Sequence, residues 1–135
     1  MAKNKTKLYV HKRKGKCGIK RWSDKELILP IEYDCITKFY DIFILVKDSK
    51  VGLSKTVINE DGLYSLDEVT PCKFNYIHYA GLNTFLLDDD KGTVYYNIEK
   101  DKLSDYYESV IAYDKDKFLQ AQTKDKFYVI NKLHY

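Results

Sequence analysis

Histidine and cysteine are the side chains of this sequence that could act as bases, nucleophiles or metal ligands. The histidines are His11, His78 and His134, and His78 follows Cys72 by six residues. A thiol beside an imidazole can act as a nucleophile, but this spacing matches no recurring cysteine-hydrolase signature. The three cysteines form no CxxC pair of the kind that zinc modules use. We therefore expect structural roles for these residues, with all three cysteines reduced and buried, and we expect no metal, no cofactor and no enzymatic activity.

Carboxylates are densest at Asp88, Asp89 and Asp90. Such a run could bind a hard cation such as calcium, but it lacks the alternating ligands and the closing glutamate of the recognised calcium loops. A solvated hairpin turn is the expected structure. The sequence also lacks the GxxxxGK[ST], GxGxxG and GxSxG patterns that mark phosphate-binding loops and nucleophile elbows.

Basic side chains are concentrated at the start of the chain. Residues 1–21 contain nine Lys or Arg and no acid, whereas residues 22–135 contain 14 Lys or Arg and 20 Asp or Glu. Such a segment can attract nucleic acid or an acidic protein surface, and it can also be only a solubilising tail, here residues 1–7. The candidates for contact with phosphates are Lys12, Arg13, Lys14 and Lys16. Trp22 is the candidate for contact with bases.

Tyrosine is the side chain best suited to a protein interface, and 13 of the 135 residues are Tyr. A tyrosine offers a large rigid surface with a polar tip, which protein interfaces favour. A core of this size cannot bury all of them, although the exposed ones could also be scattered singly over the surface. The candidate contact residues are Tyr76, Tyr79, Tyr95 and Tyr106.

The size and composition of the chain predict a single β-rich domain over residues 1–135. Hydrophobic residues make up 44% of the sequence, which is enough to build a core, and alanine, the best helix former, is rare. No apolar run approaches the length that spans a bilayer, and the lysine-rich start lacks the apolar stretch of a secretory signal. We expect a cytoplasmic protein with no membrane partner.

An eroded repeat runs along the chain, and it must position these residues. Its first element is a charged turn that enters a short apolar strand. The copies are KGKCGI at 14–19, DSKVGL at 48–53, DKGTVYY at 90–96 and KDKFYVI at 124–130. Aligning Gly18, Gly52, Tyr95 and Tyr128 gives spacings of 34, 43 and 33 residues.

A second element follows each of the first three turns. Its copies are ILPIEYDCI at 28–36, VTPCKFNYI at 69–77 and LSDYYESV at 103–110. Pro30 and Pro71 cannot donate to a sheet ladder, so they place their segments at a sheet edge or in an extended connection. Gly18 and Gly52 lie inside strands, where glycine marks a bulge or a close approach of two backbones.

The apolar runs before the turns predict the inner strands. Residues 43–46, 85–87 and 118–122 occupy this place in three successive units. The fold we predict is all-β, with about 3.5 antiparallel hairpin repeats in a meandering sheet, a small barrel or a solenoid. One segment is ambiguous, since the apolar spacing of residues 103–114 also fits a short helix.

The repeat unit resembles that of bacterial WG-repeat (KWG) proteins over roughly residues 8–135. That unit has a Gly-Lys turn, an aromatic-Gly-hydrophobic strand, a Val-Ile-Pro step and a Tyr-Asp pair. Here Cys17 and Val51 stand where the family has Trp or Tyr before the glycine. The resemblance implies an all-β binding scaffold without a shared enzymatic activity, so it carries no catalytic residues over to this chain.

Repeat architecture, abundant tyrosine and the lack of catalytic motifs together predict a non-enzymatic protein-binding module. An immunity or inhibitor protein that occludes a toxin or effector would fit this description. The alternative is a nucleic-acid-binding protein that uses the basic segment and exposed aromatic side chains. A small hydrolase built on His78 is a third hypothesis, for which the sequence nominates no substrate.

Overall fold

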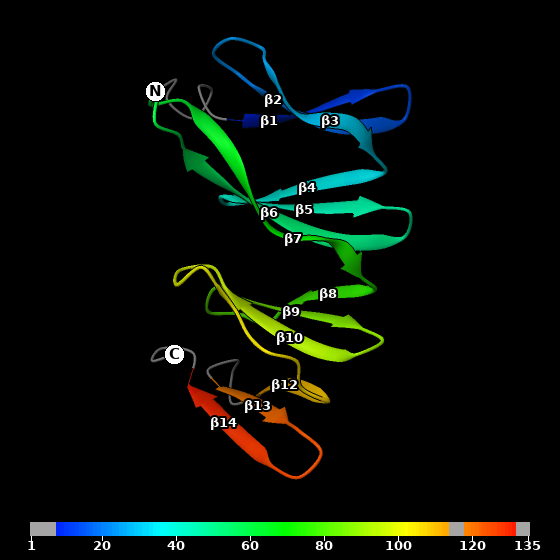
Figure 1. Ribbon diagram of the computed structural model, residues 1–135, viewed down its shortest axis with the longest axis vertical. Helices are drawn as coiled ribbons and strands as arrows, with labels where there is room; N and C mark the ends of the chain where they lie inside the picture. The colour runs from blue at the N-terminus through cyan, green and yellow to red at the C-terminus, as the bar shows by residue number, and fades with distance from the viewer. Residues whose placement is uncertain (1–7, 114–117, 132–135) are drawn as a thin grey trace. The chain divides into compact units, whose positions relative to one another are not determined.

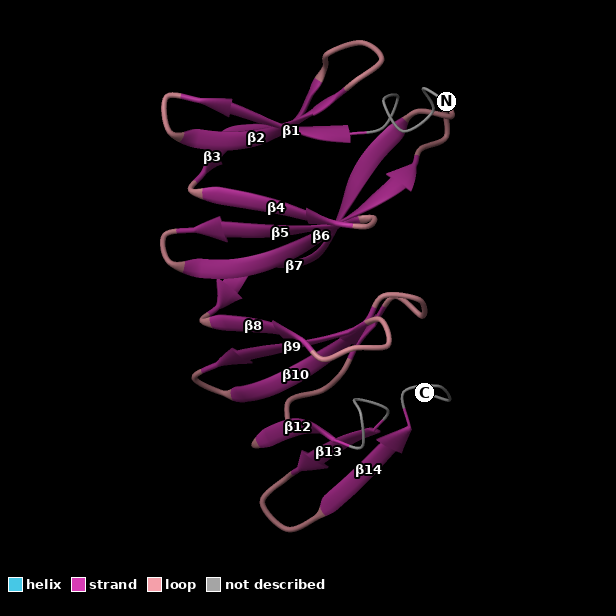
Figure 2. Cartoon of the chain, turned by 180° about the vertical axis from the view of Figure 1, so that it is seen from behind, coloured by secondary structure: helices cyan, strands magenta, loops and turns pink. Residues whose placement is uncertain are grey.

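The computed structural model describes residues 8–113 and 118–131, and every helix or strand within them is a β-strand (Figure 2). The predicted all-β fold is confirmed. The strands form four small antiparallel sheets rather than one continuous sheet, and within each sheet the neighbouring strands are consecutive in the chain. The basic tail expected at residues 1–7 lies outside the described residues.

The chain divides into two units, residues 1–73 and 74–135. Unit 1 contains the first sheet, with strand order β1-β2-β3, and the second sheet, with order β4-β5-β6-β7 (Figure 1). Its strands are β1 (Leu8–Arg13), β2 (Lys16–Arg21), β3 (Leu27–Tyr33), β4 (Cys35–Phe39), β5 (Ile42–Lys47), β6 (Lys50–Ile58) and β7 (Tyr64–Phe74).

Unit 2 contains the third sheet, with order β8-β9-β10-β11, and the fourth sheet, with order β12-β13-β14. Its strands are β8 (Tyr76–Tyr79), β9 (Thr84–Asp89), β10 (Gly92–Asn97), β11 (Lys102–Leu103), β12 (Ser109–Tyr113), β13 (Phe118–Gln122) and β14 (Phe127–Asn131). The three predicted inner runs are the β5, β9 and β13 strands, and each lies between two neighbours in its sheet.

The four predicted turns each close a hairpin. Two of them have positive φ at both central residues, at Lys14 (52°) and Gly15 (80°) and again at Asp48 (54°) and Ser49 (65°). This is the backbone of a type I′ turn, which matches the twist of antiparallel strands. Glycine adopts it at no steric cost, whereas Ser49 adopts a conformation that its Cβ disfavours.

The two glycines within β2 and β6 allow another strand to approach closely, as predicted. A Cβ built on Gly18 would lie 2.6 Å from the carbonyl oxygen of Leu29. One built on Gly52 would lie 2.7 Å from the carbonyl carbon of Pro71 and 2.8 Å from the amide nitrogen of Cys72. Only glycine leaves room for these backbones, so β3 and β7 can cover the hairpins.

The two prolines lie on edge strands, as predicted. Pro30 is in β3 and Pro71 is in β7, and each of these strands ends its sheet. An edge strand has one side without ladder partners, so a residue that lacks an N–H can be accommodated there.

The chain passes from one sheet to the next three times, and a similar backbone hydrogen bond forms at each junction. The backbone N–H of Asp34 donates to the carbonyl of Val46 at 2.8 Å, and that of Asn75 donates to the carbonyl of Asp88 at 2.7 Å. The N–H of Glu108 donates to the carbonyl of Gln122 at 2.7 Å. These three residues follow Tyr33, Phe74 and Tyr107, the aligned aromatic positions of the second repeat element.

Two of these junction side chains also hold the tip of the next hairpin. The Asp34 carboxylate accepts the backbone N–H of Asp48 at 2.9 Å and forms an ion pair with Lys16. The side-chain amide of Asn75 donates to Asp90 at 3.2 Å. Both hydrogen bonds hold the pKa of the Asp34 carboxyl below its usual range, and the bond from Lys16 has a larger effect than the bond from the Asp48 N–H.

Each unit is a two-layer sandwich with its own core. In unit 1 the core side chains come from both sheets and are Leu8, Cys17, Ile19, Ile36, Phe43 and Leu45. In unit 2 they are Ala80, Leu86, Val110, Leu119 and Ala121, with Tyr95 and Tyr107 packed against them. Burial of these apolar faces is the main contribution to the stability of such a sheet pair.

Two details of the sequence interpretation need correction. The alternative of a helix over residues 103–114 does not hold for the described residues 103–113, because Tyr107 bridges to Thr93 and residues 109–113 form β12. Pairing along β13 satisfies the backbone of β12 and overrides the helical spacing. The alignment of Tyr95 with Gly52 is also wrong by one residue, since Val94 pairs with Leu87 as Gly52 pairs with Leu45.

Candidate functional site

A groove of about 350 Å³ lies between the two sheets of unit 2, on the side of β8 and β12. Both strands are edge strands of their sheets. We call this site the β8–β12 groove. Its lining residues are Tyr76, Ile77, His78, Leu86, Asp88, Val110, Ile111 and Ala112. Tyr76 and Ile111 are 71% and 57% exposed, so large apolar surfaces flank an opening of ligand size.

Smaller core side chains accompany this groove. The pair Ile36–Leu45 in unit 1 corresponds to the pair Val110–Ala121 in unit 2, because each joins the first strand of a sheet to the second at the same register. Likewise Phe43, opposite Lys38, corresponds to Leu119, opposite Ala112. These three core positions therefore carry smaller side chains in the fourth sheet than in the second.

The third sheet gives the groove a polar floor. The Thr93 hydroxyl donates to the Asp88 carboxylate at 2.6 Å, and Asp88 is itself exposed. Asp88 pairs with Tyr76 across the ladder, and His78 pairs with Leu86, so these four side chains share one face. The groove thus combines apolar walls with the carboxylate of Asp88, the single acid among its described lining residues.

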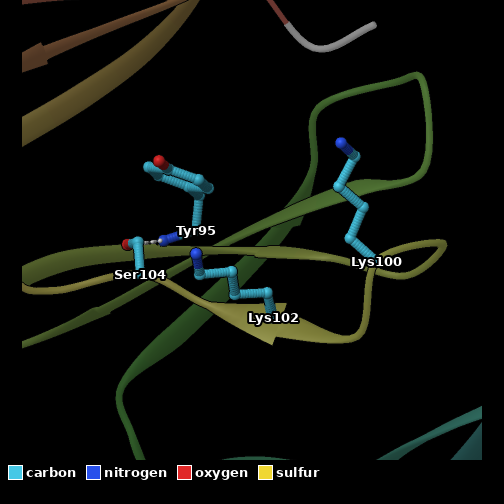
Figure 3. A pocket seen from close by; sticks show the side chains of 4 residues that line it. All are labelled: Tyr95, Lys100, Lys102 and Ser104. Atoms are coloured by element: carbon cyan, nitrogen blue, oxygen red, sulfur yellow. Dashed lines mark hydrogen bonds between the residues drawn. The ribbon is translucent and has the colours of Figure 1, made fainter. Parts of the chain in front are cut away.

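The tyrosines nominated from the sequence lie in four different settings. Tyr76 lines the β8–β12 groove, whereas Tyr79 points to the opposite face of β8, packs edge-on against Phe85 at 5.3 Å and accepts the backbone N–H of Asn83. Tyr95 lines a separate pocket with Lys100, Lys102 and Ser104 (Figure 3).

Tyr106 has a structural partner. Its hydroxyl donates to the Asp89 carboxylate at 2.5 Å, and this bond raises the pKa of Tyr106 to about 12. The ring also lies 6.5 Å from Phe74 and has the Lys91 ammonium 5.9 Å from its centroid. Tyr106 therefore ties the segment before β12 to the tip of the β9–β10 hairpin.

The basic residues nominated from the sequence are gathered on the β1–β2 hairpin. Lys12 and Arg13 end β1, Lys14 is in the turn and Lys16 begins β2. The first three are exposed, whereas Lys16 is paired with Asp34.

Trp22 follows β2 and belongs to an aromatic cluster with Tyr9. Their ring centroids are 5.0 Å apart and their planes are nearly perpendicular. The ammonium of Lys25 lies 3.6 Å from the centroid of Trp22 and 5.4 Å from that of Tyr9. This cation covers part of the tryptophan, which is 41% exposed.

The cysteines differ in their surroundings. Cys17 is buried, Cys35 is exposed and Cys72 is half-buried, and all three are free thiols. The expectation that all three are buried is therefore wrong for Cys35. The Cys72 thiol donates to the Leu45 carbonyl at 3.5 Å, and burial raises its pKa, which disfavours the thiolate that a nucleophile requires.

Residues 8–113 and 118–131 contain no group of three or more His, Cys, Asp or Glu side chains arranged to hold a metal ion. Nor do they include a helix long and apolar enough to span a membrane.

Sequence reasoning missed most residues that line the two openings of unit 2. Asp88 was interpreted only as part of an acidic turn, and Val110 to Ala112 only as an ambiguous segment. Strand alternation could not have paired Lys100 with Lys102, because residues 98–101 form a turn. Nor does a local pattern reveal the groove, which depends on side chains brought together from two sheets.

Neither a scan against protein families nor a search of curated proteins gives a match for this chain. Kinship with WG-repeat proteins therefore stays a prediction.

Proposed function

We propose that this chain is a non-enzymatic protein-binding module and that the β8–β12 groove receives an extended segment of its partner. The observation that carries the proposal is the groove itself, whose apolar walls include the exposed Tyr76 and Ile111. Exposed aromatic and aliphatic side chains around a concave site are what a partner side chain can bury. The hairpin-repeat fold is also consistent with the WG-repeat kinship proposed from the sequence.

The edge strands favour an extended segment as the occupant. Both β8 and β12 end their sheets, so each has a side on which its sheet supplies no ladder partner. A peptide in β conformation can add to such an edge through main-chain hydrogen bonds, while alternate side chains enter the neighbouring groove. A helix would lack these main-chain bonds.

Charge favours a segment that carries a Lys or Arg beside its apolar residue. Asp88 is the acidic side chain of the groove, and Thr93 fixes one face of its carboxylate. Unit 2 as a whole has ten Asp or Glu and eight Lys or Arg, whereas residues 1–73 have ten and 15. A cationic segment would therefore be attracted to unit 2 in preference to unit 1.

Peptide display tests this proposal with two groove variants. Peptides selected on the full chain should be extended, apolar and basic. Ala112→Phe fills the groove and should weaken the best peptide by roughly tenfold or more, about 1.4 kcal/mol. Asp88→Asn should weaken it by about fivefold while the Thr93 hydroxyl keeps an acceptor.

A matched control is available in unit 1. Asp67 is an exposed acid on β7, so Asp67→Asn removes the same charge outside the groove and should leave the affinity unchanged. Peptides that bind both groove variants as tightly as the unchanged chain would contradict the proposal, as would the failure of any peptide to bind.

We further propose that the partner is a toxin or effector that this module occludes, as an immunity or inhibitor protein would. Recovery of a tagged chain from its own cells should retain one protein that the Ala112→Phe copy fails to retain. An identical set of proteins on both baits would count against this role.

The second candidate function is binding of single-stranded nucleic acid by the β1–β2 hairpin. The observation that favours it is the aromatic pair Tyr9 and Trp22 on the same sheet as the exposed Arg13 and Lys14. Such a surface could stack bases and neutralise phosphates, with steep salt dependence. Replacing both basic residues with Gln should abolish retention on single-stranded DNA or RNA, and unchanged retention would exclude this function.

A further inference from the structure

The pocket around Tyr95 is separate from the β8–β12 groove. It has a volume of about 180 Å³ and is built on β10, β11 and the turn between them, whereas the groove uses β8, β9 and β12. In Figure 3, Tyr95 projects from β10, Lys102 from β11 and Lys100 from the turn between them, with the two ammonium groups directed apart. The pocket is therefore lined by two lysines, a phenol ring and a serine.

The turn after β10 places both cations at this pocket. Lys100 lies in that turn, where Asp101 has a φ of 52°, and Lys102 begins β11. Asp101 lies between the lysines, but its carboxylate accepts the Tyr96 hydroxyl at 2.6 Å. Tyr96 is paired with Leu103 and belongs to the opposite face of β10 from Tyr95. The acid between the two lysines is thus directed away from the pocket.

Buried polar contacts hold this geometry. The side-chain oxygen of Asn97, a residue only 3% exposed, accepts the backbone N–H of Lys100 at 2.7 Å. The Ser104 hydroxyl accepts the Tyr95 N–H at 2.9 Å and donates to the Asp105 carbonyl at 2.8 Å. These bonds fix the turn before any ligand arrives, so less ordering is required when one binds.

The ring of Tyr95 is also held in place. It stacks on Tyr107 with centroids 6.1 Å apart and planes only 16° from parallel. Tyr107 in turn contacts Tyr128 edge-on at 6.0 Å. The exposed part of the Tyr95 ring therefore forms a rigid apolar wall.

Neither lysine has an anionic partner within the part of the chain that the structure describes. The ion pairs found there involve Lys16, Arg21 and Lys47. An anion in the pocket would be attracted by both ammonium groups. Lysine is a common ligand of phosphate, for which it acts as a point charge.

We propose that this pocket binds a small phosphate monoester whose organic part is aromatic. Lys100 and Lys102 would hold the phosphate dianion, and Tyr95 would contact the organic part. The volume is below the roughly 300 Å³ at which sites for drug-sized ligands begin, so the ligand is small. The Ser104 hydroxyl orients the backbone at Tyr95 and already uses its proton on Asp105.

Titration of the full chain with phenyl phosphate tests this proposal, with amide chemical shifts as the readout. Binding should perturb Tyr95, Lys102 and Ser104 and should weaken as the ionic strength rises. Inorganic phosphate should bind more weakly than phenyl phosphate because it makes no contact with the ring. Equal affinities for phenyl phosphate and inorganic phosphate would overturn the proposed contact between the ligand and the Tyr95 ring.

Matched pairs of variants separate this site from general charge. The double change Lys100→Gln and Lys102→Gln should weaken phenyl phosphate by roughly tenfold or more. The double change Lys124→Gln and Lys126→Gln alters the net charge equally at exposed positions, and it should leave the affinity unchanged. Equal effects of the two pairs, or no binding to the unchanged chain, would overturn the proposal.

Discussion

Unit 1 and unit 2 are both built from two facing sheets, but they fill the space between those sheets differently. The second sheet contributes Phe43 and Leu45 to its core, and the fourth sheet contributes Leu119 and Ala121 at the same register. The same repeat therefore carries larger core side chains in unit 1 and smaller ones, beside a groove, in unit 2. The hydrogen-bonded frame of strands and turns is retained in both.

The units also secure their hairpin tips differently. In unit 1 the Asp34 carboxylate receives Lys16 and the Asp48 N–H, so an anion holds the tip. In unit 2 the neutral Tyr106 hydroxyl donates to Asp89. Protonation of Asp34 should break the first arrangement in acid, and deprotonation of Tyr106 should break the second in alkali.

The largest expected effect comes from giving unit 1 the side chain of unit 2. Leu45→Ala copies Ala121 into a position that is 4% exposed, and it should lower the free energy of unfolding by about 3 kcal/mol through lost burial and a new cavity. Ile36→Val, which copies Val110, should cost about 1 kcal/mol. Chemical denaturation measures both, and equal losses would contradict this account of the packing difference.

A slightly smaller loss is expected from Gly52→Ala. The new Cβ would meet the backbone of Pro71 and Cys72 at under 3 Å, so β7 must move, at a cost of about 2 kcal/mol. Unit 2 has a valine, Val94, at the corresponding position, and Val94→Ala should cost less because it only removes side-chain atoms. Thermal unfolding of the two variants gives the comparison, and a neutral Gly52→Ala would refute the close approach.

The turn of the β5–β6 hairpin offers a gain in stability. Ser49 has a φ of 65°, which glycine adopts without strain, so Ser49→Gly should stabilise the chain by about 0.5–1 kcal/mol. Gly15 already occupies this place in the β1–β2 turn, and Gly15→Ala should have the opposite sign. A loss of stability in Ser49→Gly would contradict the assignment of a type I′ turn.

The pH responses should be the smallest effects, because the groups are exposed. The lowered pKa of Asp34 means that its contribution is complete above the usual aspartate pKa and is lost as pH falls through the lowered value. The raised pKa of Tyr106 means that its contribution is complete below about 10 and is lost as pH rises toward about 12.

Stability measured against pH checks both signs. The free energy of unfolding of Asp34→Asn should differ from that of the unchanged chain near neutral pH and equal it in acid. For Tyr106→Phe the two free energies should become equal in alkali. Convergence at the wrong extreme for either variant would contradict the assigned hydrogen bond.

The sequence predicted the strands and their turns because each depends on local chemistry. Gly18 and Gly52 marked close backbone approaches, and Pro30 and Pro71 marked edge strands, through properties of those residues alone. The segment around Tyr107 was ambiguous because its apolar spacing fits a helix until β13 supplies a partner for β12.

The candidate groove could not be predicted in the same way. Its lining combines Val110 from β12 with Leu86 and Asp88 from β9, and that juxtaposition needs the arrangement of the strands. Tyr76 was nominated for its type alone, and its place beside Asp88 follows from pairing between β8 and β9. Side chains from separate strands form the site, whereas sequence patterns report mainly on one strand at a time.

The most direct test of peptide binding in the β8–β12 groove is to map a selected peptide on the isotope-labelled full chain by amide chemical shifts. We expect perturbations on β8, β9 and β12, at Tyr76, Asp88 and Val110 to Ala112, and we expect them to be lost in Ala112→Phe. Perturbations concentrated on the β1–β2 hairpin, or unchanged in that variant, would contradict it.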